Sequence, residues 1–257
     1  MSVFHFEYSM RLDFTSPCRE HAFALKCYPV DNERQKILSR KLEIAPATEL
    51  SFKRDWAGNT HVDGLIVGEH SYFSVKTEGE AETYASFFEE EESNPSIVYR
   101  YATARTQAGE RIRALAEQIE GDSDYDVALS ALRLAHESIR YRSGSTGVQT
   151  TAEEALAQGS GVCQDYAHLY LALLRLKKIP CRYVAGLVTG EGESHAWAEV
   201  NCKGYWYAFD PTADKLVGDG YLKLSHGRDA FDCAINRGSF KGFADQRQTI
   251  HAAMREQ

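Results

Sequence analysis

The sequence has no cluster of basic residues and no long apolar run. Its 29 lysines and arginines are outnumbered by 37 aspartates and glutamates, which gives a formal net charge of −8. Proteins that bind nucleic acid neutralise phosphates with grouped positive charge, so we expect no nucleic-acid partner. No stretch approaches the roughly 18 consecutive apolar residues that span a bilayer, and residues 1–20 alternate apolar with polar side chains instead of forming a signal sequence. We therefore expect a soluble, cytoplasmic protein with no membrane partner.

The cysteine and histidine spacings of metal sites are also missing. Because no C-x-x-C and no H-E-x-x-H occurs, neither a structural zinc site nor a zinc protease is supported, and we expect no metal. Disulfides are typical of small secreted domains with little core, whereas this chain is long and 43% apolar. We therefore expect reduced thiols at all six cysteines, which are Cys18, Cys27, Cys163, Cys181, Cys202 and Cys233.

Period-two alternation dominates the first third of the chain. Over residues 3–14 the apolar side chains from Phe4 to Phe14 alternate with polar ones, which is typical of a half-buried strand. Turn residues separate further short runs at residues 21–28, 37–44, 49–55, 61–67 and 71–77. Regularly spaced strands without helices predict a small antiparallel β-sandwich, and we assign residues 1–88 to it.

The pattern changes at the stretch SFFEEEESNPS, residues 86–96. Its run of glutamates followed by Asn94 and Pro95 predicts a solvated linker. Apolar residues then recur with helical spacing over residues 106–120 and 125–142. His136 lies on the apolar stripe of the second segment, and we interpret it as a core histidine with a partner.

A second set of elements is predicted between residues 151 and 209. Thr151 and Glu154 have the spacing of a capping box, so a short helix is expected from there to Gly159. A longer helix is expected from Cys163 until Pro180 forbids its continuation. Three strands follow at residues 181–188, 195–202 and 205–209. From residue 214 onward the pattern is mixed and predicts no element.

The cysteine in GSGVCQDYAH, residues 159–168, stands at the start of the longer helix. The positive end of the helix dipole and the unpaired backbone N–H groups favour a thiolate at this place. Glycines at 159 and 161 allow a substrate to approach the backbone and leave an N–H group for an oxyanion. A single cysteine is more often a small buried apolar side chain, so the partners of Cys163 decide between the two interpretations.

Two histidines are candidate bases for Cys163. His168 lies five residues along the same helix and therefore faces another direction, where it packs or caps a neighbour. His195 opens a strand after a glycine-rich turn, and Asp210 ends the next strand. Neighbouring antiparallel strands bring such positions together, so the Asp210 carboxylate is predicted to fix the imidazole tautomer while the other ring nitrogen faces the sulfur.

Three segments carry a resemblance to a known family. GVCQDYAHLYLALLRLKKIPCRYVAG, SHAWAEV and WYAFDPT resemble the bacterial transglutaminase-like cysteine protease family of the papain-like superfamily, over about residues 145–212. DWAGN in the amino-terminal part is similar to that family's β-domain, and GRDAFDCAINRG is similar to its carboxy-terminal segment. The resemblance implies an α+β fold, in which residues 89–257 form a catalytic domain with the cysteine helix packed on an antiparallel sheet, plus a carboxy-terminal extension.

The resemblance also implies roles for individual residues. It makes Cys163 the nucleophile, His195 the general base and acid, and Asp210 the orienting carboxylate. A second oxyanion donor would come from an upstream aromatic or amide side chain, and both Tyr141 and Gln158 fit that description. The sequence departs from the family at Cys181 and at residues 234–236, which affects packing more than chemistry.

The implied chemistry is acyl transfer through a thioester on a peptide or protein substrate, without a cofactor. Hydrolysis of the thioester makes the protein a peptidase or amidase, which we expect. Transfer to an amine would make it a transglutaminase, because the acceptor depends on how the site admits water and amines. A third hypothesis is a non-catalytic module that binds a peptide.

Overall fold

The computed structural model describes residues 2–84, 87–89 and 96–257. Its amino-terminal part is built on one long strand, β1 (Ser2–Leu25), in which apolar side chains point inward at every second position. The two strands predicted at residues 3–14 and 21–28 are therefore largely one strand. The pairing of β1 with its neighbour β5 shifts register between Asp13 and Cys18, where β1 passes from one sheet layer to the other.

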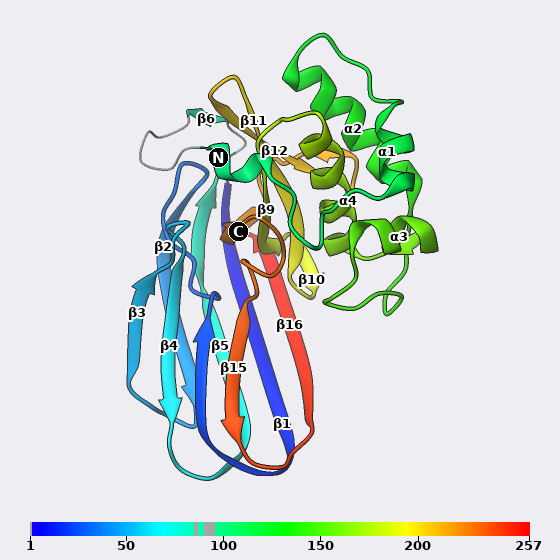
Figure 1. Ribbon diagram of the computed structural model, residues 1–257. Helices are drawn as coiled ribbons and strands as arrows, with labels where there is room; N and C mark the ends of the chain where they lie inside the picture. Colours follow the sequence, from blue (N-terminus) through cyan, green and yellow to red (C-terminus); the bar gives the residue numbers. More distant parts are fainter. Residues whose placement is uncertain (1, 85–86, 90–95) are drawn as a thin grey trace.

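The predicted antiparallel sandwich is confirmed (Figure 1). The first half of β1 pairs with β5 and β16, and its second half pairs with β4 and β15. β2 extends the first layer beside β5, and β3 extends the second beside β4. The core between the layers includes Phe6, Met10, Phe23, Val62 and Phe73. The further strands of this part are β2 (Gln35–Ala45), β3 (Leu50–Arg54), β4 (Thr60–Ile66) and β5 (His70–Thr83).

The carboxy-terminal segment, for which the sequence predicted no element, returns to this sandwich. β15 (Asn236–Lys241) and β16 (Gln246–Glu256) both pair with β1, and β10 (Gly190–Gly192) lies on the other side of β16. Figure 1 shows β16, in red, alongside the blue strand β1. Ala252 and Met254 are buried in the sandwich core. The division into domains at residues 88 and 89 stays a prediction.

A second antiparallel sheet carries the helices. Its strand order is β13-β12-β11-β9-β14, with β6 paired to β12. The strands are β6 (Phe88–Glu89), β9 (Cys181–Val188), β11 (His195–Cys202), β12 (Tyr205–Asp210), β13 (Lys215–Leu216) and β14 (Tyr221–Gly227). The three central strands lie where the sequence predicted them. Of the predicted linker, residue 86 and residues 90–95 lie outside the described residues.

Helix α4 (Cys163–Leu176) is buried between this sheet and the other helices. Around it pack α1 (Glu110–Ala116), α2 (Asp124–Ser138) and α3 (Ala152–Gln158), preceded in the chain by the 3₁₀ helix η1 (Ser96–Arg100). The predicted capping box of α3 is present, with Gly159 in the left-handed conformation at φ 69°. α2 ends four residues earlier than predicted, because Ile139 is extended and β7 (Arg140–Tyr141) pairs in parallel with β8 (Ser160–Gly161). The predicted α+β fold is confirmed.

The DWAGN segment docks the sandwich onto the second sheet. The side-chain amide of Asn59 donates to the carbonyl of His226 at 2.7 Å, and the backbone N–H of His226 donates to the Asn59 side-chain oxygen at 2.8 Å. The Asp55 carboxylate, which forms an ion pair with Lys26, also accepts from the Asn59 amide. This segment therefore joins a turn of the sandwich to β14 of the second sheet.

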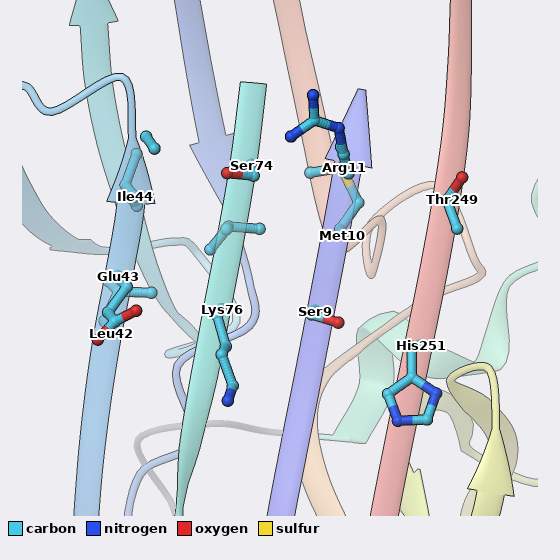
Figure 2. A pocket seen from close by; sticks show the side chains of 12 residues that line it. Ser9, Met10, Arg11, Leu42, Glu43, Ile44, Ser74, Lys76, Thr249 and His251 are labelled. Carbon is cyan, nitrogen blue, oxygen red and sulfur yellow. The ribbon is translucent and has the colours of Figure 1, made fainter. Parts of the chain in front are cut away.

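A cavity of about 640 Å³ lies on the first layer of the sandwich. Its lining residues lie on β2, β5, β1 and β16, and Figure 2 shows Lys76, Ser9 and His251 among the labelled side chains. None of the residues that line it is one of the predicted site residues. Within the described residues, no helix is long and apolar enough to cross a membrane.

Candidate active site

Cys163 is the first residue of α4, and hydrogen bonds fix the turn that precedes it. The buried carboxylate of Asp165 accepts from the backbone N–H of Val162 at 2.7 Å and from the hydroxyl of Thr146 at 2.6 Å. A side chain at Gly161 would place its Cβ 2.6 Å from the Asp165 Cβ, so only glycine leaves room for this carboxylate. The sulfur therefore stands at the amino-terminal end of a buried helix, where backbone N–H groups are available to an anion.

His195, the first residue of β11, and Asp210, the last residue of β12, lie together at one end of these neighbouring strands. Nε2 of His195 lies 2.8 Å from Oδ2 of Asp210. The hydroxyl of Tyr221 donates to the same Oδ2 at 2.7 Å, and the backbone N–H of Thr212 donates to Oδ1 at 2.9 Å. Burial opposes ionisation of Asp210, but the hydrogen bond and charge of His195 together with these donors lower its pKa. The backbone N–H of Ala213 also donates to Oδ1 at 3.3 Å, so Asp210 is a buried, ionised carboxylate with four partners.

His195 also faces Cys163. Because Nε2 is bonded to Asp210, Nδ1 is the nitrogen available to the sulfur. Burial lowers the pKa of His195, but hydrogen bonds to Asp210 and Cys163, with the charges of both, raise it to about 9. The ring is stacked on Trp197, with 6.4 Å between ring centroids. The protonated imidazole is therefore the favoured form at neutral pH, and it stands between a carboxylate and a sulfur.

Cys163 and His195 line one cavity of about 430 Å³. One wall comes from the second sheet and the turn before it, through Tyr183, Glu193 and Ser194. Another comes from the sandwich, through Tyr8 of β1 and Gln248 of β16, so both parts of the chain enclose the site. The segment at residues 230–236 adds a third wall.

All six cysteines are free, as predicted, but only Cys163 is partly exposed. Cys233 lines the same cavity and provides a comparison. It is buried, and burial raises its pKa to about 12. A reagent that enters the cavity therefore meets one partly exposed thiol beside a protonated imidazole and one buried thiol in its neutral form.

The two predicted oxyanion donors differ in their surroundings. The Gln158 amide donates to the Ser145 carbonyl at 2.9 Å and to the Ser160 hydroxyl at 3.1 Å. Tyr141 is paired with Gly161, two residues before Cys163. Burial and then the charge of Cys163 raise the pKa of the Tyr141 hydroxyl, so this group lies within electrostatic reach of the sulfur. Tyr141 is the better placed of the two, and its role stays a prediction.

The other two histidines named from the sequence have structural partners. His168 is fully buried, and its Nε2 accepts from the backbone N–H of Ala230 at 3.1 Å. Burial lowers its pKa to about 3, so it remains neutral and holds the 230–236 wall against α4. His136 lies with Nδ1 3.2 Å from the carbonyl of Pro211. The interpretation of His168 as a packing histidine is confirmed, and His136 has the predicted partner but is half-buried and not part of the core.

Tyr221 is a neighbour of the predicted site that the sequence pattern did not indicate. Tyr221 opens β14, in the region where no strand was predicted, so no pattern placed it beside Asp210. Trp197 follows His195 by two positions on β11 and therefore shares its face, which period-two alternation alone indicates. The described residues contain no group of three or more His, Cys, Asp or Glu side chains that could hold a metal ion.

Comparisons with known proteins agree with this architecture. Residues 113–211 match the family model of the transglutaminase-like superfamily, and residues 4–82 match that of the bacterial transglutaminase-like N-terminal region. "Uncharacterized protein ML0607" of Mycobacterium leprae is 30% identical over 251 residues, which cover 89% of this chain and 90% of that protein. "Uncharacterized protein Rv2569c" of Mycobacterium tuberculosis is 37% identical over 114 residues, covering 38% of this chain and 36% of that one.

A solved structure shares the fold over nearly the whole chain. It is "a Putative Cysteine Protease from Cytophaga hutchinsonii", with a TM-score of 0.82 and 23% sequence identity. The match covers 99% of this chain and 90% of that one. The arrangement of sandwich, second sheet and helices is therefore common to both proteins.

Proposed function

Because the chain belongs to the transglutaminase-like superfamily, we propose that it is a cysteine-dependent acyl-transfer enzyme that hydrolyses an amide bond of a peptide or protein. Cys163 is the nucleophile, His195 the general base and acid, and Asp210 the residue that orients His195. The observation that carries this proposal is the imidazole of His195, with a pKa of about 9 between the Asp210 carboxylate and the Cys163 sulfur.

In the first half of the reaction, the sulfur of Cys163 attacks the amide carbonyl. The sulfur lies at the amino-terminal end of α4 and beside the protonated imidazole of His195, which is the setting of an activated cysteine nucleophile. The S–C bond forms as the carbonyl oxygen becomes an anion, which the backbone N–H of Cys163 is placed to stabilise. His195 then donates its Nδ1 proton to the leaving amine, the C–N bond breaks, and a thioester remains on Cys163.

In the second half, water attacks the thioester. His195, now neutral, accepts a proton from the water through Nδ1, while Asp210 stabilises the imidazolium that forms. The C–S bond breaks, and the carboxylic acid leaves as the thiolate and imidazolium are restored. Hydrolysis is favoured over amine transfer because Cys163 is partly exposed in an open cavity that admits water. The description of the Cytophaga hutchinsonii structure as "a Putative Cysteine Protease" is in line with the same choice.

The activated sulfur is tested by alkylation with iodoacetamide at pH 6, followed by peptide mass mapping of all six cysteines. We expect Cys163 to be modified at least tenfold faster than any other cysteine, because the others are buried. Cys163→Ala removes the fast phase, and the matched variant Cys233→Ala, from the same cavity, retains it. Equal modification of the six thiols would contradict the proposal.

The acceptor is tested separately with a glutamine-containing peptide, in the presence and absence of a primary amine. Hydrolysis predicts release of ammonia and formation of glutamate in both samples. Incorporation of the amine in place of water would instead make the enzyme a transglutaminase. If the Cys163→Ala variant binds peptides that wild-type protein binds but never turns over, the protein is a peptide-binding module.

A further inference from the structure

One wall of the cavity that contains Cys163 places two guanidinium groups against one aromatic ring. The guanidinium carbon of Arg105 lies 5.3 Å from the ring centroid of Phe231, and that of Arg237 lies 3.9 Å from it. Arg105 and Phe231 line the cavity, and Arg237 follows the lining residue Asn236. Phe231 is 53% exposed, which is unusual for a phenylalanine in a folded protein. Arg105 and Phe231 therefore face the cavity that contains Cys163, and Arg237 packs on the Phe231 ring.

The members of this cluster are held in place by other groups. Arg105 donates from Nε to the Val148 carbonyl at 3.1 Å and from Nη2 to the Gln149 side-chain oxygen at 2.7 Å. The backbone N–H of Phe231 donates to Oδ1 of Asp229 at 2.8 Å, which fixes the turn that presents the ring. Arg105 and the backbone of Phe231 are therefore ordered before a ligand binds, which lowers the conformational entropy cost of binding there.

The positive charge of the cluster is not neutralised within the described residues. Arg228, on the same segment, forms an ion pair with Asp232 at 2.8 Å, but neither Arg105 nor Arg237 is among the described residues that form ion pairs. Nε and Nη2 of Arg105 already donate to Val148 and Gln149, so the described residues leave its Nη1 group and the N–H groups of Arg237 as donors for a carboxylate. Across the cavity, Glu193 adds a negative charge beside Ser194 and His195. The charge of the cavity is thus positive on one wall and negative on the other.

We infer that the cluster of Arg105, Phe231 and Arg237 binds a carboxylate of the substrate, so that the enzyme prefers acidic peptides as acyl donors. This inference rests on the proposed function, because it assumes that Cys163 is the reacting group. The apolar ring of Phe231 contacts the carbon chain that carries the carboxylate, and the two guanidinium groups hold the charge. Glu193 on the opposite wall repels the same carboxylate and thereby fixes the direction in which the peptide lies.

The test uses three probes with different side-chain charge, the iodoacetyl derivatives of glutamate amide, glutamine amide and lysine amide, of which the first two are nearly equal in shape. In each, the Cys163 thiolate displaces iodide and forms an S–C bond, and intact-protein mass spectrometry gives the rate. We expect the glutamate probe to react about three to ten times faster than the glutamine probe, and the lysine probe to be slowest, as for a charge interaction across a partly solvated cavity. The ratio should fall at high salt.

Variants of Arg105 and Arg237 test whether the cluster causes the preference for the glutamate probe. Arg237→Gln and Arg105→Gln should each lower the glutamate-to-glutamine rate ratio at least twofold, and Arg237→Glu should bring it below one. Arg237 is exposed on β15, so its variants keep the test valid if Arg105→Gln disturbs the turn at residues 148–149. Arg19→Gln, an exposed arginine of the sandwich outside the cavity, is the matched control and should leave the ratio unchanged.

The outcomes separate this inference from the proposed function. If the glutamine probe modifies Cys163 rapidly but the three probes react at equal rates, or the ratio is unchanged in both arginine variants, the inference is wrong and the proposed function stands. If the glutamine probe modifies Cys163 no faster than the buried cysteines, the proposed function is wrong and the inference falls with it.

Discussion

Tyr221 donates its hydroxyl hydrogen to Oδ2 of Asp210 at 2.7 Å, and the same oxygen lies 2.8 Å from Nε2 of His195. Two donors on one oxygen leave the carboxylate little freedom to rotate, and both donors lie in buried or half-buried surroundings. The aspartate therefore presents a fixed edge to the imidazole. Tyr221 acts on the reaction through Asp210, as a positioning residue.

Tyr221→Phe should slow the alkylation of Cys163 without unfolding the protein. The variant removes one hydrogen bond to a buried charge, and about 1 kcal/mol of lost orientation corresponds to roughly fivefold in rate. The iodoacetamide rate at pH 6 measures the effect. Tyr205→Phe is the matched control, because its hydroxyl donates to Glu89 elsewhere on the second sheet, and it should leave the rate unchanged. Equal rates in all three proteins would show that Tyr221 has only a packing role.

Asp210→Asn should lower the pKa of His195 from about 9 toward its ordinary value, because the charge that stabilises the imidazolium is removed. Titration of the histidine ring resonances by NMR from pH 5 to 10 measures this directly. His168 and His21 have pKa values lowered to about 3 and about 4 by burial, so neither titrates in this range. A His195 pKa that does not change in the variant would contradict the assigned role of Asp210.

The same shift predicts how the stability of the protein depends on pH. Because the pKa of folded His195 lies above its unfolded value of about 6.5, protonation of this ring favours the folded state. The contribution is fully present below about pH 6.5 and is lost as the pH rises through about 9. In the Asp210→Asn variant the melting temperature should therefore fall less between these pH values than it does in the wild-type protein. An equal fall in both proteins would mean that the protonation of His195 does not stabilise the fold through Asp210.

Local sequence signals were sufficient for the elements that carry the predicted site. The capping box of Thr151 and Glu154 is formed, and the strands that hold His195 and Asp210 occur as predicted, because turns delimit them. Asp210 follows Phe209, which pairs with Ala198, so Asp210 lies opposite Trp197 and on the same face of the sheet as His195. Their proximity thus follows from pairing between consecutive strands.

Contacts between distant segments left no comparable signal. β16 pairs with β1 from the opposite end of the chain, and nothing in the period-two pattern of either strand specifies its partner. For the same reason the sequence did not indicate that Tyr8 and Gln248 line the cavity of Cys163. The position of Tyr221 was also not predicted, because the bulge in β14 near Lys223 interrupts the alternation of side chains that would have indicated a strand.

Glu199→Gln should strongly destabilise the fold. Glu199 is fully buried, and its carboxylate contacts Arg182 at 2.7 Å and Lys223 at 2.8 Å. Burial opposes the ionisation of Glu199, but the charges of Lys223 and Arg182 lower its pKa to about 2. The stabilising charge is therefore present above about pH 4.5, and it is lost as the pH falls through about 2. A neutral amide leaves two buried cations uncompensated, which costs about 3 to 5 kcal/mol in the free energy of unfolding.

Urea unfolding at pH 7 measures this cost, and two further variants define it. Glu43→Gln removes the carboxylate of an exposed pair with Lys41 and should leave the unfolding midpoint unchanged. Adding Lys223→Met to Glu199→Gln should restore part of the stability, because one of the two buried charges is removed. A loss of stability in Glu199→Gln no larger than in Glu43→Gln would contradict the account.

Tyr8→Phe should not destabilise the protein, although Tyr8 is almost completely buried. Its hydroxyl has no hydrogen-bond partner among the described residues, and a buried polar group without a partner costs free energy. The matched variant is Tyr170→Phe, because the equally buried Tyr170 hydroxyl donates to the Ala128 carbonyl at 3.0 Å. We expect Tyr170→Phe to lower the free energy of unfolding by about 1 kcal/mol and Tyr8→Phe to leave it unchanged or raise it. Urea unfolding compares the two variants, provided that the slope of the unfolding free energy against urea concentration is the same in both. A larger loss of unfolding free energy in Tyr8→Phe than in Tyr170→Phe would mean that the Tyr8 hydroxyl has a hydrogen-bond partner in solution.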